Sequence, residues 1–468
     1  MNSWTIRGLF GAVLLTSGAT TAAGQAVTLE PHQELAREIL RELIEINTVD
    51  SAGTTAAAQA VEARLLDAGF TSEDVHVVGP NDRKMNLVAR LRGSDSGKQP
   101  LLLLAHLDVV EALPTDWNMD PWTMNERDGY YYGRGVTDDK DEAAIYTANL
   151  IRFKQEGYVP DRDIIVALTA DEEGGDFNGV QWLLQNRRDL IYASYALNEG
   201  GGGAIKDGVH QLNSVQASEK VYQSFWLRAT NPGGHSSVPR EDNAIYDLVN
   251  ALLQISEYRF PVMLNEVTRA YFTATAEVEG GAVAGAMRTM LADPRNTPAV
   301  ERLQRFPHYN ARMRTTCVAT RLSGGHADNA LPQTAEAMVN CRILPDHNPA
   351  EVLATLRQVA GAGVEITADA APNPSPPSPL SAEVLGPVQR ITEEMWPGVP
   401  VVPVMSTGAT DGLHLRRAGI PVYGVSGLFG DVDDSRAHGQ DERILIESFF
   451  EGQEFLYRLV KALSGTIS

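Results

Sequence analysis

The chain has 468 residues, which is long for a single hydrophobic core and favours two domains. Its formal net charge is −21 and only 39 residues are Lys or Arg, so neither nucleic acid nor an anionic membrane is an expected partner. The acidic excess by itself indicates only a well-solvated surface.

The N-terminus has the pattern of a secretory signal peptide, which is predicted to cover residues 1–23. Arg7 gives a weakly positive start, residues 9–15 are mostly apolar, and residues 21–23 are small enough for a cleavage site. No later segment offers about 20 uninterrupted apolar residues, so no membrane-spanning helix is expected. The mature protein is therefore expected to be periplasmic or secreted, and free of the membrane.

Helices and strands alternate through the first half of the mature chain. Helical spacing or helix signals predict helices at 33–46, 55–68, 142–155 and 179–186, and apolar runs or alternation predict strands at 85–91, 101–105, 163–169 and 194–197. The segment 101–105 is continuously apolar, as in a strand buried on both faces. This order predicts an α/β layered catalytic domain, with a central mostly parallel sheet flanked by helices, whose first part spans residues 28–215.

From residue 216 the pattern changes to that of an inserted α+β unit, predicted to span 216–344. Its strands are expected at 221–230, 315–321 and 336–344 and its helix at 242–255, while 260–309 has no clean periodicity and is either helical or irregular. The second part of the layered domain follows at 345–468 and ends in a helix predicted at 442–463. The two cysteines, Cys317 and Cys341, fall in two of the strands, where they either pair or remain buried thiols.

Five polar motifs fall where predicted strands end or helices begin. In chain order, the residues that stand out are His106, Asp138, Glu173, Glu199 and His438. Each has an ordinary structural explanation when taken alone, such as a strand-end histidine, a helix N-cap or a solvated acidic turn. Ligands of α/β sheets, however, bind at the carboxyl ends of the strands. Two histidines with three carboxylates form a set suited to zinc or a similar divalent cation, with a position left open for water.

Two further acidic residues have roles beside these candidate ligands. Glu172 precedes Glu173 at a strand end, and adjacent carboxylates there point in different directions, so that one can bind metal while the other faces water. Asp108 lies two positions after His106, on the same side of the strand, where it can orient the imidazole.

Six segments taken together resemble the dizinc hydrolases of the aminoacylase, glutamate carboxypeptidase and carboxypeptidase S type. In order they are Leu-Ala-His-Leu-Asp-Val-Val, Gly-Arg-Gly-Val-Thr-Asp-Asp-Lys, Thr-Ala-Asp-Glu-Glu-Gly-Gly, Leu-Asn-Glu-Gly, Gly-Gly-His-Ser-Ser and His-Gly-Gln-Asp-Glu. The resemblance covers nearly the whole mature chain, from His106 to His438. It implies two bound Zn²⁺ ions, with Co²⁺ or Mn²⁺ as alternatives, and a water bridged between them.

The resemblance also assigns roles to single residues. The implied ligands are Asp138, which bridges both metals, His106 and Glu199 at one site, and Glu173 and His438 at the other. Glu172 becomes the general base, which takes a proton from the water and passes it to the leaving amine. Asp108 orients His106, and the peptide bond between Asp138 and Asp139 is expected to be cis.

The inserted unit resembles the family's lid, which dimerises in many members, so a homodimer through this unit is implied. His235, in Gly-Gly-His-Ser-Ser, resembles the donor that stabilises the oxyanion, often from the partner subunit. Asn329 and Arg342 resemble lid residues that hold the substrate, and an Arg fork suits a terminal carboxylate. Gly408 and Thr410 resemble the loop whose backbone meets the same carboxylate.

These observations predict an exported zinc-dependent amidohydrolase or exopeptidase, of carboxypeptidase or dipeptidase type, that cleaves an amide bond next to a free carboxylate. An N-acyl amino acid hydrolase would use the same residues, because only the pocket around the acyl side differs. A noncatalytic metal-containing binding protein is the third alternative. The intact base at Glu172 and the five intact ligand positions argue against it. The expected substrate is a small peptide or an N-acyl amino acid.

Overall fold

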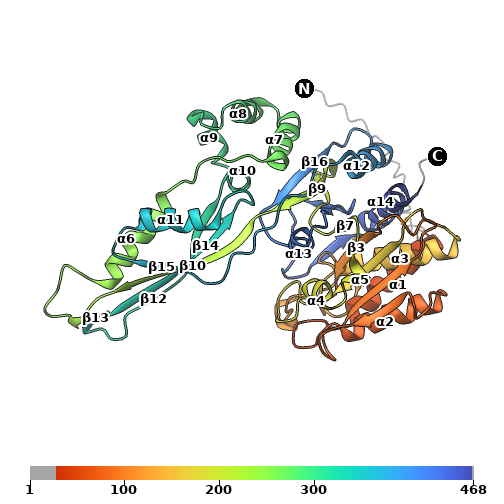
Figure 1. Cartoon of the computed structure of the whole chain (residues 1–468), viewed down its shortest axis with the longest axis horizontal. Helices are drawn as coiled ribbons and strands as arrows, with labels where there is room; N and C mark the ends of the chain where they lie inside the picture. The colour runs from red at the N-terminus through yellow and green to blue at the C-terminus, as the bar shows by residue number, and fades with distance from the viewer. Residues whose placement is uncertain (1–27, 466–468) are drawn as a thin grey trace, which may run out of the picture.

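A ten-stranded sheet occupies the centre of one half of the molecule (Figure 1) in the computed structural model, which describes residues 28–465. The strand order is β1-β2-β6-β3-β7-β17-β9-β8-β18, with β16 paired to β9. The strands are β1 (Val75–Val78), β2 (Asn86–Leu91), β3 (Leu101–His106), β6 (Ile164–Thr169), β7 (Tyr195–Asn198), β8 (Gly203–Lys206), β9 (Val209–Glu219), β16 (Val401–Ser406), β17 (Val422–Gly424) and β18 (Phe429–Asp431). The central run β6-β3-β7-β17 is parallel. The predicted signal peptide at 1–23 lies outside the described residues.

Helices cover both faces of this sheet, because alternate side chains of its strands enter two different cores. In β3, Leu101 and Leu103 join one core, and Leu102 and Leu104 join the other. The first core contains side chains of α1 (Pro31–Glu45), α2 (Thr55–Asp67), α3 (Lys140–Gln155), α12 (Ala382–Met395) and α14 (Ile446–Ser464). The second contains side chains of α4 (Gly179–Asn186), α5 (Arg188–Ile191) and α13 (Gly412–Arg417). The predicted layered α/β fold with its mainly parallel sheet is therefore confirmed.

A separate antiparallel sheet, with the order β12-β14-β10-β15, forms the core of a second unit that we call the lid (Figure 1). Its elements are β10 (Val221–Thr230), β12 (Thr316–Gly324), β14 (Thr334–Ile343), β15 (Glu365–Ala368), α6 (Ala244–Glu257) and α11 (Pro349–Ala360). At its tip, β11 (Gly234–His235) pairs with β13 (Ala330–Leu331). Two further features lie outside the insertion described next, a three-stranded sheet and a 3₁₀ turn. The sheet consists of β4 (Asn125–Arg127), β5 (Tyr130–Tyr132) and β19 (Arg443–Leu445), and the turn is η1 (Pro114–Asp116).

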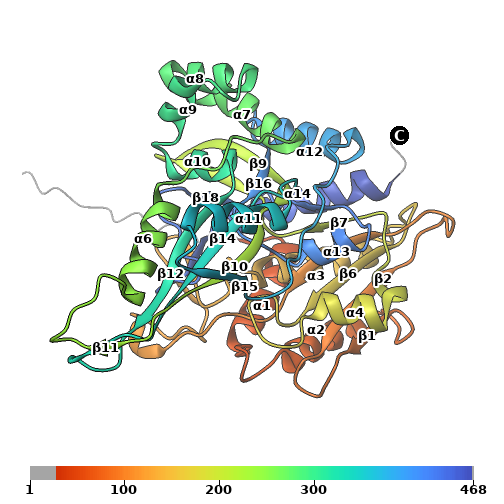
Figure 2. The same ribbon diagram turned by 60° about the vertical axis from the view of Figure 1, so that its left-hand side comes forward.

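The segment without clean periodicity folds into four short helices, α7 (Glu266–Glu279), α8 (Gly281–Ala292), α9 (Thr297–Leu303) and α10 (Pro307–Met313). We call this segment the helical insertion; Figures 1 and 2 show it beside β16. Its own core includes Phe272 and Met287 and extends to Val402 of β16. The insertion therefore packs against the main sheet, although it interrupts the sequence of the lid.

Three expectations about single segments need correction or completion. The lid sheet continues beyond residue 344, where the sequence placed its end, because β15 pairs with β10. The last helix begins at Ile446 instead of residue 442, since Arg443–Leu445 pair with β5. Cys317 and Cys341, left open by the sequence, face each other on β12 and β14 and form a disulfide. Among residues 28–465, no helix combines the length and apolar character needed to cross a membrane.

Candidate metal centre

His106 ends the buried strand β3, and its ring has two well-defined partners. Only 2% of the residue is exposed. Its Nδ1–H donates to the backbone carbonyl of Asp108 at 2.9 Å, and its Nε2 lies 2.9 Å from Oδ1 of Asp138. Burial would lower the pKa of His106, but the hydrogen bond to Asp138 and the negative charge of Asp108 raise it well above its ordinary value. The carbonyl contact fixes Nδ1 as the donor, which directs Nε2 towards the carboxylates.

Asp138 lies between the two predicted metal-binding histidines. Its Oδ1 contacts His106, and its Oδ2 lies 3.0 Å from Nε2 of His438. The peptide bond between Asp138 and Asp139 is cis, as the resemblance implied. Burial opposes ionisation of Asp138, but hydrogen bonds from the two histidines outweigh it and lower its pKa. One carboxylate thus offers an oxygen to each side, as a bridging ligand must.

The loop before Asp138 is held by Glu442. The Glu442 carboxylate accepts hydrogen bonds from the backbone N–H groups of Gly135, at 3.2 Å, and Thr137, at 3.0 Å, and it pairs with Arg134 at 2.6 Å. Gly135 has φ +88°, and a Cβ there would lie 2.8 Å from the Val109 side chain, so the turn requires glycine. Glu442 lies four residues after His438, and a single segment therefore supplies one candidate ligand and fixes the loop that carries another.

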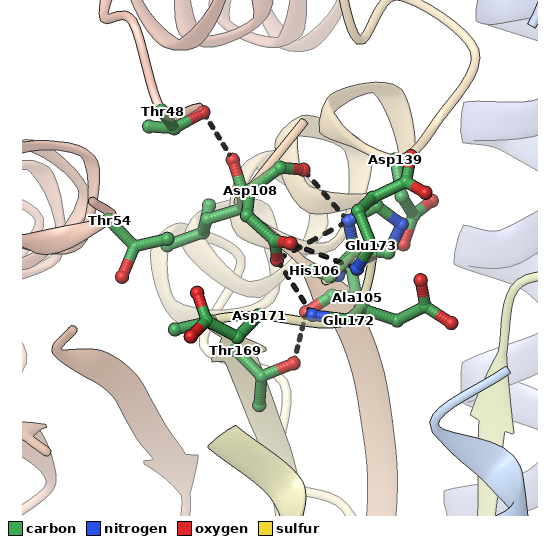
Figure 3. Close-up of polar contacts among 12 residues, drawn as sticks. Thr48, Thr54, Ala105, His106, Asp108, Asp139, Thr169, Asp171, Glu172 and Glu173 are labelled. Carbon is green, nitrogen blue, oxygen red and sulfur yellow. Dashed lines mark hydrogen bonds and ion pairs between the residues drawn. The ribbon is translucent and has the colours of Figure 1, made fainter. Parts of the chain in front are cut away.

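Asp108 fixes the loop that carries Glu172 and Glu173 (Figure 3). Its Oδ1 accepts the N–H of Glu172 at 3.1 Å, and its Oδ2 accepts the N–H of Glu173 at 3.0 Å. The carboxylate is 3.7 Å from Nδ1 of His106, so Asp108 orients the ring through its backbone carbonyl, not through its carboxylate. The sequence prediction that Asp108 orients His106 describes only half of this arrangement.

The two adjacent glutamates face different partners. Oε1 of Glu173 lies 2.7 Å from Nε2 of His438. The Glu172 carboxylate lies instead close to His106 and to Glu199, which follows β7. Burial raises the pKa of Glu172 to about 10; His106 opposes this shift, and the charge of Glu199 adds to it. Burial likewise raises the pKa of Glu173, and that of Glu199 well above its ordinary value. The division of roles expected for neighbouring carboxylates is therefore sterically feasible.

The donor atoms fit a divalent cation. Within the groups His106–Asp138–Glu173 and His106–Glu172–Glu199, the donor atoms lie within 4.8 Å of one another. The raised pKa values of the glutamates reflect carboxylates crowded into a buried site, which cations would relieve. Imidazole nitrogens and carboxylate oxygens are the ligands of zinc and related ions. A cation at Nε2 of His106 would replace the proton that this nitrogen shares with Asp138.

The predicted lid residues lie apart from this cluster within the same chain. His235 and Asn329 are exposed and lie together at the lid tip, where the backbone N–H of Ser236 donates to the Asn329 carbonyl at 3.0 Å. Figure 1 shows this tip, at β13, far from β3. Arg342 lies on β14 with its guanidinium 4.7 Å from the ring centre of Tyr222. The structure thus brings none of these three into one group with the candidate ligands.

The loop at 408–410 is held to the end of β9. Glu219 accepts hydrogen bonds from the N–H of Thr410 at 3.0 Å and from its hydroxyl at 3.1 Å. Gly408 is fixed by its N–H, which donates to Oγ of Ser406 at 3.0 Å. Asn198, which precedes Glu199, donates to the Thr410 hydroxyl at 3.4 Å. The loop is therefore connected to the segment that carries one candidate ligand.

Sequence reasoning missed two residues that build the site. Asp139 accepts the backbone N–H of His106 at 3.1 Å and so ties the cis-linked pair to the end of β3. Glu442 fixes the 134–137 loop, as described above. Both are buried acids within quoted motifs, next to or near a predicted ligand. The available signal was a carboxylate close in sequence to a predicted ligand, but the sequence does not show that it is buried or which groups it contacts.

A cavity of about 730 Å³ opens beside Asp138 and Glu199. One part of its wall is acidic and includes Asp141 and Glu142, and another part is apolar and includes Leu428 and Phe429. The cavity is large enough for a small organic ligand, whose reactive bond would lie next to the candidate metal ligands.

Known proteins match this chain over most of its length. The model of peptidase family M20/M25/M40 matches residues 102–462. The human N-fatty-acyl-amino acid synthase/hydrolase PM20D1 is 27% identical over 449 residues, covering 91% of this chain and 87% of that protein. Human aminoacylase-1 is 26% identical, covering 80% and 82%. The M20 family metallo-carboxypeptidase Sso-CP2 from Sulfolobus solfataricus has the same fold, with a TM-score of 0.68, 18% identity and coverage of 92% and 99%.

Proposed function

The chain belongs to peptidase family M20/M25/M40, and from this premise we propose that it is a dizinc exopeptidase, of carboxypeptidase or dipeptidase type, that cleaves an amide bond next to a free carboxylate. The observation that carries the proposal is the arrangement around Asp108, whose carboxylate holds the backbone of Glu172 and Glu173. That contact leaves Glu173 beside His438 and Glu172 beside His106. A base and a set of ligands are thereby held within one small site, which is partly buried and is open to solvent at His438.

Each residue of this site has a chemical role in the proposed reaction. When bound by His106, Asp138, Glu173, Glu199 and His438, two Zn²⁺ ions supply a Lewis acid that makes water acidic and polarises the scissile carbonyl. Glu172 accepts the proton from the attacking water and delivers it to the leaving nitrogen. Asp108 keeps Glu172 in reach of both atoms, and Asp139 fixes the end of β3.

We further propose that the substrate's terminal carboxylate is held by Arg342 and Asn329 and lies beside the loop of Gly408 and Thr410, whose backbone N–H groups already donate to Ser406 and Glu219. A planar guanidinium offers a carboxylate two parallel hydrogen bonds, which a lysine does not. Burial lowers the pKa of Arg342 without removing its charge, since arginine stays protonated in proteins. Its place on β14 of the lid requires the lid to approach the sheet end when substrate binds.

A second substrate class is favoured by a specific observation. The apolar wall of the large cavity, with Leu428 and Phe429, suits a hydrocarbon acyl group, while the acidic wall with Asp141 suits the free amine of a peptide. Two relatives are named for N-acyl amino acid chemistry, the human PM20D1 protein and aminoacylase-1. Hydrolysis of N-acyl amino acids is therefore the second candidate, and it uses the same catalytic residues.

One experiment separates the two classes. Release of free amino acid is measured from dipeptides, tripeptides, N-acetyl and long-chain N-acyl amino acids, with zinc and with a chelator. Chelator-sensitive cleavage of peptides alone supports the exopeptidase, and cleavage of N-acyl amino acids alone supports the second candidate. No cleavage across the panel by protein that holds two metals per chain would contradict both, and favour a noncatalytic binding protein.

We also propose that the protein acts as a homodimer, in which His235 serves the site of the partner subunit as an oxyanion donor. The proposal is supported by apolar side chains exposed on neighbouring lid elements, namely Tyr246 and Leu253 of α6 and Val318 and Leu322 of the edge strand β12. An unpaired strand edge with apolar neighbours is suited to pairing with a second copy. A well-placed donor stabilises the oxyanion by about 3 kcal/mol.

A mixed-dimer experiment tests this assignment. A His235→Ala chain and a Glu172→Gln chain are each expected to be inactive. Co-expression is expected to restore about a quarter of the wild-type activity, because about half of the randomly paired dimers are mixed and one of the two sites in each mixed dimer has both residues. Light scattering should give twice the chain mass. A monomer, or no recovery of activity in the mixture, would contradict the shared site.

Export to the periplasm or the extracellular space is proposed as well. It is supported by the signal-like pattern at residues 1–23 and by the Cys317–Cys341 disulfide, a bond that persists in oxidising compartments. Cell fractionation with N-terminal sequencing of the mature protein tests the proposal. Recovery of an uncleaved chain from the cytoplasm would contradict it.

A further inference from the structure

A second cavity, of about 500 Å³, lies where the helical insertion meets α6 and the start of β12. Arg259, Arg305 and Arg314 line it, and no Asp or Glu of residues 28–465 does. The chain carries 60 acidic residues against 39 basic ones, so an acid-free pocket with three arginines departs from its overall character. We call this pocket the arginine pocket.

Arg314 is the buried member of the arginine pocket. Only 4% of the residue is exposed, and within the described part of the chain its Nε has no hydrogen-bond partner and its guanidinium no ion-pair partner. Burial lowers the pKa of Arg314, and the charge of Arg259 adds to this shift. A buried cation is normally paired, because desolvating a charge without a counter-charge is costly.

The other arginines differ in how they are held. Nη1 of Arg259 donates to the backbone carbonyls of Ser256, at 2.6 Å, and Tyr258, at 3.0 Å, so that this guanidinium is anchored at the end of α6. Arg305 follows α9 and is exposed at the rim. Asn310 adds a side-chain amide, whose –NH₂ group can donate to an oxyanion. The pocket thus combines three positive charges with a polar group, contributed by segments far apart in the sequence.

The arginine pocket is distinct from the site proposed for the substrate carboxylate. Cys317 lines it and faces Cys341 across the strand pair β12–β14, and Cys341 is fully buried in the core on the helix side of the lid sheet. Successive strand residues point to opposite faces, so Arg342 projects from the other face of the same sheet. An anion in the pocket is therefore separated by the sheet from one held by Arg342.

We propose that the arginine pocket binds a small, multiply charged oxyanion, either free phosphate or the phosphate or carboxylate groups of a small metabolite. Guanidinium groups match the oxygens of such anions with paired, charge-assisted hydrogen bonds. The bound anion supplies the partner that Arg314 lacks, and it connects α6 to the helical insertion. Folded protein with the anion bound is then more stable than protein without it.

Calorimetric titration of the full mature protein with inorganic phosphate tests the proposal, with a phosphomonoester and succinate as parallel ligands. Arg305→Ala removes an exposed side chain and is expected to weaken binding about tenfold, the value of one lost charge-assisted hydrogen bond. Arg314→Gln is expected to weaken it at least as much. Arg302→Ala, an exposed arginine on α9 outside the pocket, is the matched control and should bind as the wild type does.

The outcomes separate the ligand sources and the sites. Preference for phosphate or the phosphomonoester supports a phosphate ligand, and preference for succinate supports a carboxylate. Anion binding at the metal centre would be unaffected by Arg305→Ala, so equal affinity in the wild type and both pocket variants overturns the proposal. Absence of any heat of binding and of any thermal stabilisation by millimolar phosphate, the phosphomonoester and succinate overturns it too.

Discussion

Asp108→Asn tests whether the loop that carries the base is positioned by a single carboxylate. The wild-type side chain, 4% exposed, accepts two backbone N–H groups, from Glu172 at 3.1 Å and Glu173 at 3.0 Å. Asparagine keeps the shape but places an amide –NH₂ opposite one of these donors. The loss of one hydrogen bond to a charged group is worth about 1.5–3 kcal/mol, so that kcat is expected to fall about 10- to 100-fold.

Steady-state kinetics and metal analysis distinguish positioning from general destabilisation. The contact between the His106 ring and the Asp108 carbonyl is a backbone contact, so it survives the substitution. Asp163→Asn is the matched control, because Asp163 also accepts a backbone N–H, that of Gly93 at 2.7 Å, and pairs with Arg90. Asp163 precedes the first residue of β6, whereas the Glu172 loop follows its last residue. Both variants should lose stability, but only Asp108→Asn should lose turnover. An unchanged kcat in Asp108→Asn would refute the reasoning.

Three further predictions concern stability. Replacing Cys317 and Cys341 together by Ser removes a cross-link between residues 24 apart and should lower the free energy of unfolding by about 3 kcal/mol in urea titrations; an unchanged midpoint would contradict it. Removal of metal by a chelator should lower Tm, and added zinc should restore it, because ligands of the folded state stabilise it; a Tm insensitive to chelator would argue against a built metal site. Burial and the charge of Arg417 lower the pKa of His414 from 6.5 to about 4, so the neutral form is favoured on folding. The stabilising contribution of neutral His414 is complete above pH 6.5 and is lost as the pH falls towards 4; at pH 5 the loss is about 1 kcal/mol after allowance for solvent screening. Between pH 7 and pH 5, His414→Gln should therefore lose less free energy of unfolding than the wild type in urea titrations.

The central sheet and its polar edge could be predicted because the signals were local. The continuous apolar run at 101–105 indicated a strand buried on both faces, and its side chains do divide between two cores. Candidate ligands followed from their position after such strands. The placement of these ligands in one cluster follows from parallel pairing of β6, β3 and β7, which brings the strand ends to one edge.

What escaped prediction depended on contacts between distant segments. The helices of the helical insertion are short, and α8 is rich in alanine and glycine; they gain their stability from packing against Val402 and one another, so that no strong periodicity marks them. The pairing of β15 with β10 is likewise invisible in sequence. The anchoring of the Glu172 loop by the Asp108 carboxylate depends on distances that spacing alone does not give.

The central claim is that Glu172 is the proton carrier and Glu173 a metal ligand, although the two are adjacent. Turnover and metal content measured side by side in Glu172→Gln and Glu173→Gln test it most directly. Glu172→Gln is expected to retain two metals per chain and to lose activity by about 10²-fold or more, and Glu173→Gln is expected to bind less metal. Retained activity in Glu172→Gln would contradict the assignment. So would the reverse pattern of metal content, in which Glu172→Gln loses metal and Glu173→Gln keeps it.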